Sequence, residues 1–254
     1  MNNIYSPSLY FKKYNKVNSF PTSMRLFCFH YAGGSASNFK KWATKLPEQV
    51  EVIAVQLPGR ENRIMEKPFN NIQSIICELA VEILPLLDKP YVFFGHSMGA
   101  LLSYEMSWYL KENFSTSPEK LIISSFRAPH LSPITNNIHD LSVPIFIEKL
   151  KEMGGTSEEI LSNQELMELI IPTIRADFEV CEKYVYKERN KLNCPIVAYG
   201  GTEDSRVRLE HLKQWEKHTS KAFKVQMLPG NHFYLKEVEK ELLYLISKEL
   251  LENN

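Results

Sequence analysis

Short apolar segments alternate with amphipathic stretches along most of this chain, and this order restricts the fold more than any other feature. The apolar segments have the length of strands buried on both faces: MRLFCF (24–29), EVIAVQL (51–57), YVFF (91–94), LIISS (121–125), CPIVAYGG (194–201) and AFKVQML (222–228). Apolar residues at helical spacing fill the intervals: NFKKWATKL (38–46), NIQSIICELAVEILPLL (71–87), ALLSYEMSWYL (100–110), LEHLKQWEKH (209–218) and KEVEKELLYLISKELL (236–251). This alternation predicts an α/β fold, in which a mostly parallel central sheet carries helices on both faces.

The alternation stops between about residue 135 and residue 190. This part holds FIEKLKEM, a Gly154-Gly155 break, EEILSNQELMELI and a further stretch from Pro172 towards Tyr186, with no strand pattern between them. A helical insertion within an α/β chain predicts a lid over the active edge of the sheet. We therefore expect a single domain over residues 1–254, in which residues 1 to about 22 form an extended segment before the first strand.

The charge balance argues against several classes of function. Thirty basic and thirty acidic residues among 254 give no overall field for nucleic acid or an anionic membrane. No apolar run approaches the roughly 20 residues of a membrane-spanning helix, and the N-terminal residues lack the apolar core of a signal peptide. We therefore expect a cytoplasmic monomer that binds neither nucleic acid nor membrane.

The cysteines give no indication of a metal site. Cys28, Cys77, Cys181 and Cys194 stand singly, without a CxxC pair and without histidines at zinc-ligand spacing. Each lies in an apolar stretch, so we expect free thiols that pack as small apolar side chains. The sequence indicates no metal and no cofactor.

The pentapeptide Gly95-His96-Ser97-Met98-Gly99 has the GxSxG pattern of a nucleophile elbow. A strand-like segment precedes it and a helical segment follows, as such an elbow requires. Its serine adopts a strained backbone at a tight turn, which is tolerable only where the residues two before and two after lack bulk. Ser97 is therefore the candidate nucleophile, and the Met98 N–H at the helix start is a candidate oxyanion donor. The alternative is a glycine-rich turn without chemistry.

A serine hydroxyl needs a base to take its proton, and the chain has seven histidines. His232 lies between the last predicted strand and the final helix, where the chain order serine, acid, histidine of the α/β-hydrolases places the base. The alternative is a loop histidine that caps this helix. The other histidines have different expected places: pointing away from the hydroxyl (His96), at the end of the first strand (His30), on a solvated helix face (His211, His218), or as candidate substrate contacts (His130, His139).

The acid that orients the base is expected in the loop after a late strand. YGGTED supplies Glu203 and Asp204 there, and we prefer Asp204 because it comes deeper over the sheet edge. Glu203 is the alternative, and either residue is also a candidate helix N-cap.

The second oxyanion donor is expected in the glycine-rich loop after the first core strand. There, Gly33 and Gly34 let the backbone turn so that the Ala32 N–H faces Ser97, unless the turn serves only the chain reversal.

Together these segments resemble a type II thioesterase, the stand-alone α/β-hydrolase that accompanies nonribosomal peptide and polyketide synthases. The similarity covers nearly the whole chain after the first 22 residues, and it is carried by FHYAGGSASNFKKW, LPGRENR, FFGHSMGALLSYE, ADFEVCEKY, YGGTED and GNHFYL. Carried over by position, Ser97 is the nucleophile, Asp204 the acid, His232 the base, and Ala32 and Met98 the oxyanion donors. One departure is His30, where the family commonly has proline.

The resemblance implies hydrolysis of acyl groups from the 4'-phosphopantetheine arm of carrier proteins, which removes misprimed or stalled units. A chain-releasing fatty-acyl thioesterase or a carboxylesterase is the alternative on the same scaffold, because fold alone does not set the substrate. A hydrolase-fold protein that only binds an acyl group or a carrier is a further alternative.

Two further groups of residues, one of arginines and one of apolar residues in the insertion, each have two interpretations. Arg60, Arg63 and Arg127 flank the predicted site and could receive an acidic carrier, but local ion pairs explain them equally well. The apolar side chains of the insertion would line an acyl channel, or they would pack as an ordinary helix face; they are Phe146, Ile147, Leu150 and Met153.

Overall fold

A computed structural model describes residues 8–14, 21–132 and 137–252 of the chain. Its centre is a mixed seven-stranded sheet in the order β1-β3-β2-β4-β5-β6-β7. The strands are β1 (Phe11–Tyr14), β2 (Met24–Phe29), β3 (Val50–Val55), β4 (Tyr91–His96), β5 (Lys120–Ser124), β6 (Ile196–Gly201) and β7 (Phe223–Leu228). Strands β2 to β7 pair in parallel, and β1 is antiparallel to β3. The predicted α/β fold with a mostly parallel sheet is therefore confirmed.

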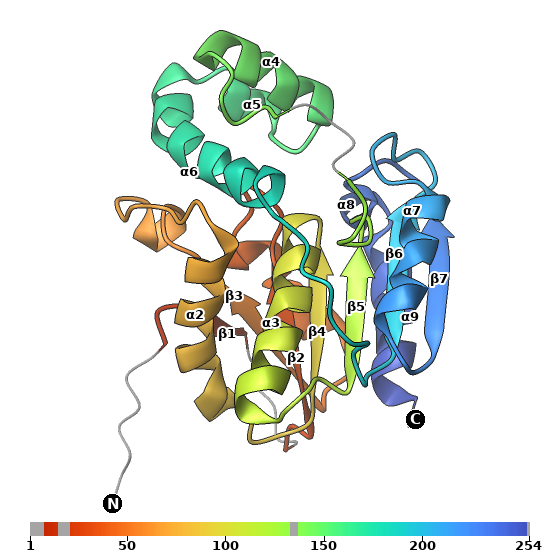
Figure 1. The fold of residues 1–254 in the computed structure, drawn as a ribbon. Coiled ribbons are helices and arrows are strands. Elements are labelled where there is room, and N and C mark those ends of the chain that lie inside the picture. Colours follow the sequence, from red (N-terminus) through yellow and green to blue (C-terminus); the bar gives the residue numbers. More distant parts are fainter. Residues whose placement is uncertain (1–7, 15–20, 133–136, 253–254) are drawn as a thin grey trace, which may run out of the picture.

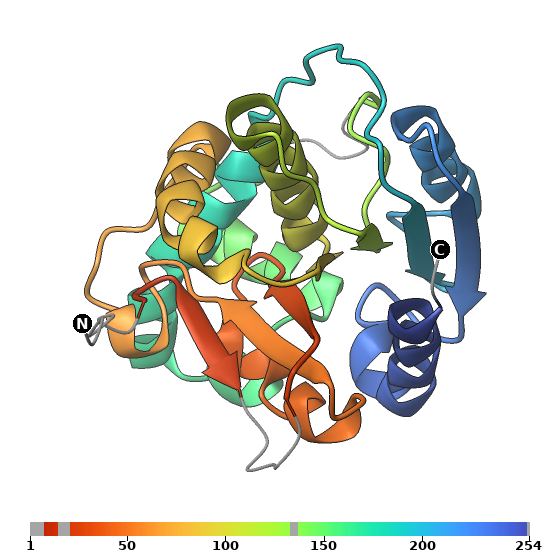
Figure 2. The ribbon, with the colours of Figure 1, turned by 90° about the horizontal axis from the view of Figure 1, so that it is seen from below.

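Helices cover both faces of the sheet (Figure 2). One face packs against α2 (Ile72–Ile83) and α3 (Met98–Phe114), and the other packs against the segment around Trp42 and against α9 (Glu239–Leu251). Because successive side chains of a strand point to opposite faces, β2 contributes Phe27 to the first layer and Leu26 to the second. Both layers need apolar residues, which explains why the central strands read as continuous apolar runs.

Three helices lie together above the carboxyl ends of the strands (Figure 1). They are α4 (Val143–Met153), α5 (Glu158–Leu161) and α6 (Gln164–Glu182), and they share a small core that includes Phe146, Leu150 and Ile174. A single helix, α6, runs through Pro172 and joins the end of EEILSNQELMELI to the stretch that follows it. That these helices act as a lid, and that the chain is one domain, stay predictions; residues 135 and 136 of the predicted insertion lie outside the described residues.

Several expected elements differ in detail. Part of the expected lead-in, at residues 11–14, is the edge strand β1, in which Phe11 is buried and Lys13 is exposed. The expected helix over 38–46 is a 3₁₀ turn, η1 (Ala36–Phe39), followed by a single-turn helix, α1 (Trp42–Lys45). The remaining short elements are η2 (Glu61–Arg63), η3 (Leu84–Leu86), α7 (Leu209–Lys213), η4 (Gln214–His218) and α8 (Tyr234–Glu237). Across the described parts of the chain, no helix combines the length and hydropathy needed to cross a lipid bilayer.

Candidate active site

Ser97 occupies a sharp turn between β4 and α3, and its backbone is strained. Its φ of 53° and ψ of −120° lie outside the regions that non-glycine residues favour. The flanking glycines explain how the turn fits: a Cβ on Gly95 would lie 2.1 Å from the carbonyl oxygen of Gly99, and a Cβ on Gly99 would lie 2.0 Å from that of Phe29. The strain is held in place by a hydrogen bond of 2.8 Å from the Ser97 N–H to the Ser124 carbonyl.

Three side chains from distant parts of the sequence meet at this turn. The Oγ of Ser97 lies 3.0 Å from Nε2 of His232, and Nδ1 of the same imidazole lies 2.7 Å from Oδ2 of Asp204. Asp204 follows β6 and His232 follows β7, so all three stand at the carboxyl edge of the sheet. Glu203, the alternative acid, is exposed and makes no contact with the imidazole.

The surroundings set the protonation states of the acid and the base. Burial lowers the pKa of His232, and the charge of Arg206 lowers it further. The hydrogen bond that the imidazole donates to Asp204 only partly opposes this, so the pKa lies below its ordinary value. Burial would raise the pKa of Asp204, but hydrogen bonds from His232 and from the N–H groups of Arg206 and Val207 outweigh it and hold this pKa low. A neutral imidazole beside a carboxylate is the state that a general base requires.

The glycine-rich loop after β2 lies against the same site. Ala32 and Ser97 line one cavity, and Gly33, at a φ of 74°, turns the chain immediately after Ala32. The Ala32 N–H has no hydrogen-bond acceptor in the described part of the chain. Met98 is the first residue of α3, where N–H groups have no partner within the helix. The roles of both N–H groups as oxyanion donors remain predictions.

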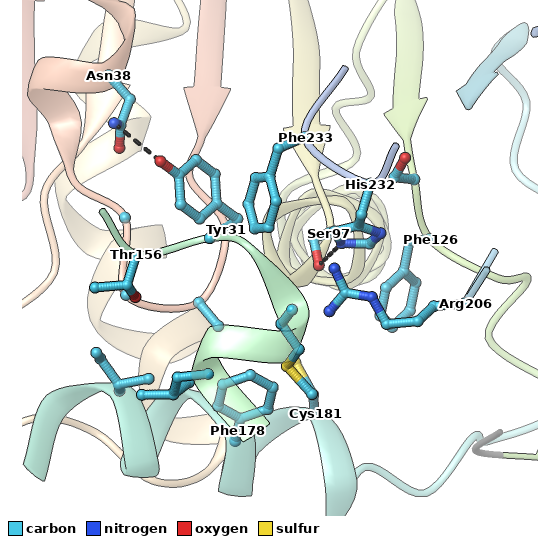
Figure 3. A pocket seen from close by; sticks show the side chains of 18 of the residues that line it. Tyr31, Asn38, Ser97, Phe126, Thr156, Phe178, Cys181, Arg206, His232 and Phe233 are labelled. Atoms are coloured by element: carbon cyan, nitrogen blue, oxygen red, sulfur yellow. Dashed lines mark hydrogen bonds between the residues drawn. The ribbon is translucent and has the colours of Figure 1, made fainter. Parts of the chain in front are cut away.

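A cavity of about 390 Å³ extends from Ser97 towards the helices above the sheet (Figure 3). Leu150 and Met153 line it, as one of the two sequence interpretations expected, whereas Phe146 and Ile147 pack between the helices instead. Other apolar lining residues come from α5 and α6 and were not among the candidates predicted from the sequence: Ile160, Ile170, Ile174 and Phe178. The i, i+4 spacing of Ile170, Ile174 and Phe178 is the signal that would have placed them on one helix face.

Most of the other histidines form hydrogen-bond contacts with side chains other than Ser97. The Nδ1 of buried His96 lies 2.8 Å from the Ser124 hydroxyl of the neighbouring strand. His218 is not on a solvated face as expected: it is buried, 3.1 Å from the Tyr104 hydroxyl and 2.7 Å from His130. Neither His130 nor His139 lines the Ser97 cavity.

Two of the three arginines considered for carrier docking form local ion pairs, which was the alternative interpretation. Arg60 is buried and donates to both oxygens of Asp177 at 2.9 Å. Arg63 is also buried and pairs with Glu66. Arg127 is half-buried and donates to the Leu131 carbonyl.

The cysteines differ in exposure more than the sequence predicts. Cys28 and Cys194 are buried as expected, Cys181 lies partly exposed on the cavity wall, and Cys77 is exposed. All four are free thiols. The described residues contain no group of three or more histidine, cysteine, aspartate or glutamate side chains placed to hold a metal ion.

Comparisons with a family model and with known relatives indicate the same family. Residues 24–250 match the family model described as Thioesterase domain. GrsT of Aneurinibacillus migulanus, a gramicidin S biosynthesis protein, is 41% identical over 234 residues, which cover 92% of this chain and 91% of GrsT. LgrE of Brevibacillus parabrevis, named a linear gramicidin dehydrogenase, is 42% identical over 228 residues, 89% of this chain and 87% of LgrE.

Solved structures also include thioesterases that are similar to this chain. The type II thioesterase BorB from the borrelidin biosynthetic cluster superposes with a TM-score of 0.87 at 33% identity, covering 96% of this chain and 98% of BorB. The match to the family model spans nearly all of the sheet and every helix around the site. The chain therefore belongs to the Thioesterase domain family.

Proposed function

We propose that this protein is a serine thioesterase of the type II class, which hydrolyses acyl thioesters on the 4'-phosphopantetheine arm of carrier proteins. Its role would be to remove misprimed or stalled acyl groups during nonribosomal peptide or polyketide synthesis. The observation that carries the proposal is the continuous contact from Ser97 Oγ to His232 Nε2, and from His232 Nδ1 to Asp204 Oδ2. This contact is what activation of a serine hydroxyl needs.

In the proposed reaction, Ser97 Oγ attacks the thioester carbonyl carbon while His232 Nε2 takes the hydroxyl proton. The N–H groups of Ala32 and Met98 would donate to the oxyanion that forms. The tetrahedral intermediate collapses when the carbon–sulfur bond breaks, and the imidazolium returns its proton to the sulfur. A thiol pKa of about 8.5 makes this departure easier than that of an alkoxide. Water, deprotonated by His232, then releases the acid and regenerates Ser97.

The helices α4 to α6 are the proposed lid, and the cavity below them is the proposed acyl site. Leu150, Met153 and Phe178 offer an apolar wall for an acyl chain whose carbonyl lies at Ser97. In this proposal the chain acts as a single-domain monomer and meets carrier domains in the cytoplasm. It needs no cofactor, because the hydroxyl, imidazole and carboxylate supply every proton transfer of the reaction.

The relatives support hydrolysis within biosynthesis of this kind. BorB is titled a type II thioesterase, and GrsT is named for gramicidin S biosynthesis. LgrE is named a dehydrogenase, and for this chain we propose hydrolysis instead, because the turn after β4 presents a strained serine to a histidine–aspartate pair.

The test compares Ser97→Ala with Ser162→Ala, which changes an exposed serine on the C-cap of α5. Both variants are assayed on one acyl group carried by a phosphopantetheinyl carrier, by coenzyme A and as an ethyl ester. We expect Ser97→Ala to lose at least about 10³-fold in kcat, Ser162→Ala to lose nothing, and the carrier to be the best substrate.

Other outcomes would point elsewhere. Hydrolysis retained by Ser97→Ala would contradict the proposal, and so would consumption of a nicotinamide cofactor in place of acid release. A preference for coenzyme A or for the ester would support the fatty-acyl thioesterase or the carboxylesterase. Failure of a fluorophosphonate to label folded wild-type protein would support a protein that only binds.

A further inference from the structure

Among the described residues, the side chain of Arg206 in the Ser97 cavity has no hydrogen-bond acceptor, and its guanidinium carbon lies 5.9 Å from the centre of the Phe233 ring. Its Nη2 is buried and has no hydrogen-bond partner, and the residue lines the cavity together with Ser97 and His232. Figure 3 shows the guanidinium directed toward these two side chains. All other arginines of the chain have an acceptor or an ion pair: Arg25, Arg60, Arg63, Arg127, Arg175, Arg189 and Arg208. Arg206 therefore differs from them in a way that needs an explanation.

The carboxylates near the cavity are already occupied. Asp204 accepts from His232 and from the N–H groups of Arg206 and Val207. Glu182, the one acidic residue on the cavity wall among the described residues, accepts from the N–H of Ile138 and contacts His139. A buried charged donor left without an acceptor is costly, so the missing acceptor is expected to come from outside the protein.

Ser125 gives a second, independent observation at the same place. It follows β5, in which Ser124 is in register with His96 of β4, so Ser125 stands beside Ser97 at the sheet edge. Its φ of 46° is in the left-handed region that serine rarely adopts. Ser125 lines the cavity, and its buried hydroxyl has no hydrogen-bond partner in the part of the chain that the structure describes. A hydrogen bond of 2.9 Å from its N–H to the Tyr199 carbonyl holds this backbone in place.

We infer that Arg206 and Ser125 form a polar subsite that binds an oxygen atom of the substrate within a few bonds of the thioester carbon. The inference rests on the proposed function and deepens it by naming a substrate class. A guanidinium only donates hydrogen bonds, so the bound atom is an acceptor: a carbonyl, hydroxyl or carboxylate oxygen. A free ammonium at this position is repelled by the like charge of Arg206.

Two parts of a carrier-bound substrate bear such an oxygen. One is the acyl group, when it is oxidised near the thioester, as in a 3-oxoacyl chain. The other is the amide carbonyl of the pantetheine arm closest to the sulfur. The chemistry of recognition is the same for both, and substrates that differ in only one of the two positions distinguish them.

The test measures kcat/KM for wild type and for the variants Arg206→Gln and Ser125→Ala on three thioesters. The first ratio compares 3-oxohexanoyl with hexanoyl, both on N-acetylcysteamine, and reports on the acyl oxygen. The second compares hexanoyl on N-acetylcysteamine with hexanoyl on butanethiol, and reports on the amide oxygen. Division by the wild-type ratio cancels the intrinsic reactivity of each thioester. Arg208→Gln, an exposed arginine two residues away, is the matched control.

We expect one of the two ratios to fall in both variants. The expected fall is about 10-fold or more in Arg206→Gln, which loses a hydrogen bond from a charged group, and about 3-fold or more in Ser125→Ala, which loses a neutral one. The same ratio is expected to stay within about 2-fold in Arg208→Gln. The ratio that falls identifies the source of the oxygen. Ratios that stay unchanged in either variant would overturn the subsite, even where kcat/KM drops equally for all three thioesters. Should Ser125→Ala fail to fold, Ser125→Gly also removes the hydroxyl and suits the positive φ. Absence of hydrolysis of all three thioesters by wild type would instead contradict the proposed function.

Discussion

The carboxylate of Asp177, on α6, accepts a hydrogen bond of 2.8 Å from the backbone N–H of Gly33. The same carboxylate receives both terminal nitrogens of Arg60 at 2.9 Å, and the two side chains are 1% and 7% exposed. One buried acid thus joins a helix above the sheet edge to the loop that carries Ala32. The position of the Ala32 N–H therefore depends on α6.

Replacing Asp177 by asparagine tests this dependence. The change keeps the size of the side chain but leaves the Arg60 cation buried without a countercharge, so we expect the free energy of unfolding to fall by about 3 kcal/mol. Because the Gly33 N–H also loses a charged acceptor, we expect kcat to fall about 10-fold or more. Urea unfolding and steady-state kinetics measure the two effects.

A double variant separates position from stability. Arg60→Met with Asp177→Leu removes both buried charges, and such replacements often restore stability. We expect its free energy of unfolding to return towards wild type while kcat stays low, because Gly33 still lacks its acceptor. Recovery of kcat together with stability would show that Asp177 acts on folding alone.

The flanking glycines of the Ser97 turn give a steric prediction. A Cβ on Gly99 would lie 2.0 Å from the Phe29 carbonyl oxygen, which belongs to a central strand and has no room to move. We therefore expect Gly99→Ala to unfold the chain or to abolish hydrolysis. Gly154→Asn is the control, since nothing lies within 4 Å of its added Cβ and asparagine tolerates its φ of 70°. An active, stable Gly99→Ala variant would mean that the turn does not need a glycine there.

Local patterns in the sequence were sufficient to predict the central strands and the order of the site residues. The inner strands β2 to β6 carry apolar runs because both faces of the sheet are covered, whereas the edge strand β7 alternates partly buried apolar residues with exposed polar ones. Ser97, Asp204 and His232 each follow one of the parallel strands, and parallel strands bring their carboxyl ends to one edge. Their meeting is therefore a consequence of topology that the residue pattern already contains.

Features that depend on distant partners were not predicted. Arg60 and Asp177 are 117 positions apart, so nothing near Arg60 indicates that its charge is buried and paired. Strand β1 has the mixed sequence FKKY, and only its antiparallel pairing with β3 makes it a strand. His218 lies in a charged segment, yet it is enclosed by Tyr104 of α3 together with Trp215 of its own element, η4.

The pH dependence of hydrolysis is expected to follow His232. Its pKa lies below the ordinary histidine value of about 6.5, mainly through burial and then through the charge of Arg206. The acidic limb of the kcat/KM profile is therefore expected at a lower pH than that of an ordinary histidine. In Arg206→Gln one nearby positive charge is gone, the pKa of His232 rises, and the limb moves to higher pH. A limb that stays in place, measured on hexanoyl-N-acetylcysteamine, would contradict this electrostatic link.

The buried histidines predict how the folded protein responds to acid. Burial, with the charges of His130, Lys191 and Lys217, lowers the pKa of His218 to about 4, while in the unfolded chain a histidine titrates near 6.5. Between these two values the unfolded chain binds a proton that the folded protein does not. The free energy of unfolding therefore falls as the pH is lowered through this range, by up to about 1.4 kcal/mol per pH unit for this one group. His30 and His96, whose pKa values burial also lowers, add in the same direction.

Urea unfolding at pH 7, 6 and 5 measures this slope, and His218→Gln isolates one contribution to it. The glutamine amide takes up no proton in this range and can still hydrogen-bond to the Tyr104 hydroxyl, which His218 contacts at 3.1 Å. We expect the variant to lose less stability than wild type between pH 6 and pH 5. The slope of the free energy of unfolding against pH should be smaller by about 1.4 kcal/mol per pH unit, which corresponds to one proton. Equal slopes for the two proteins would mean that His218 becomes protonated as readily in the folded state as in the unfolded chain, which its enclosure between Tyr104 and Trp215 opposes.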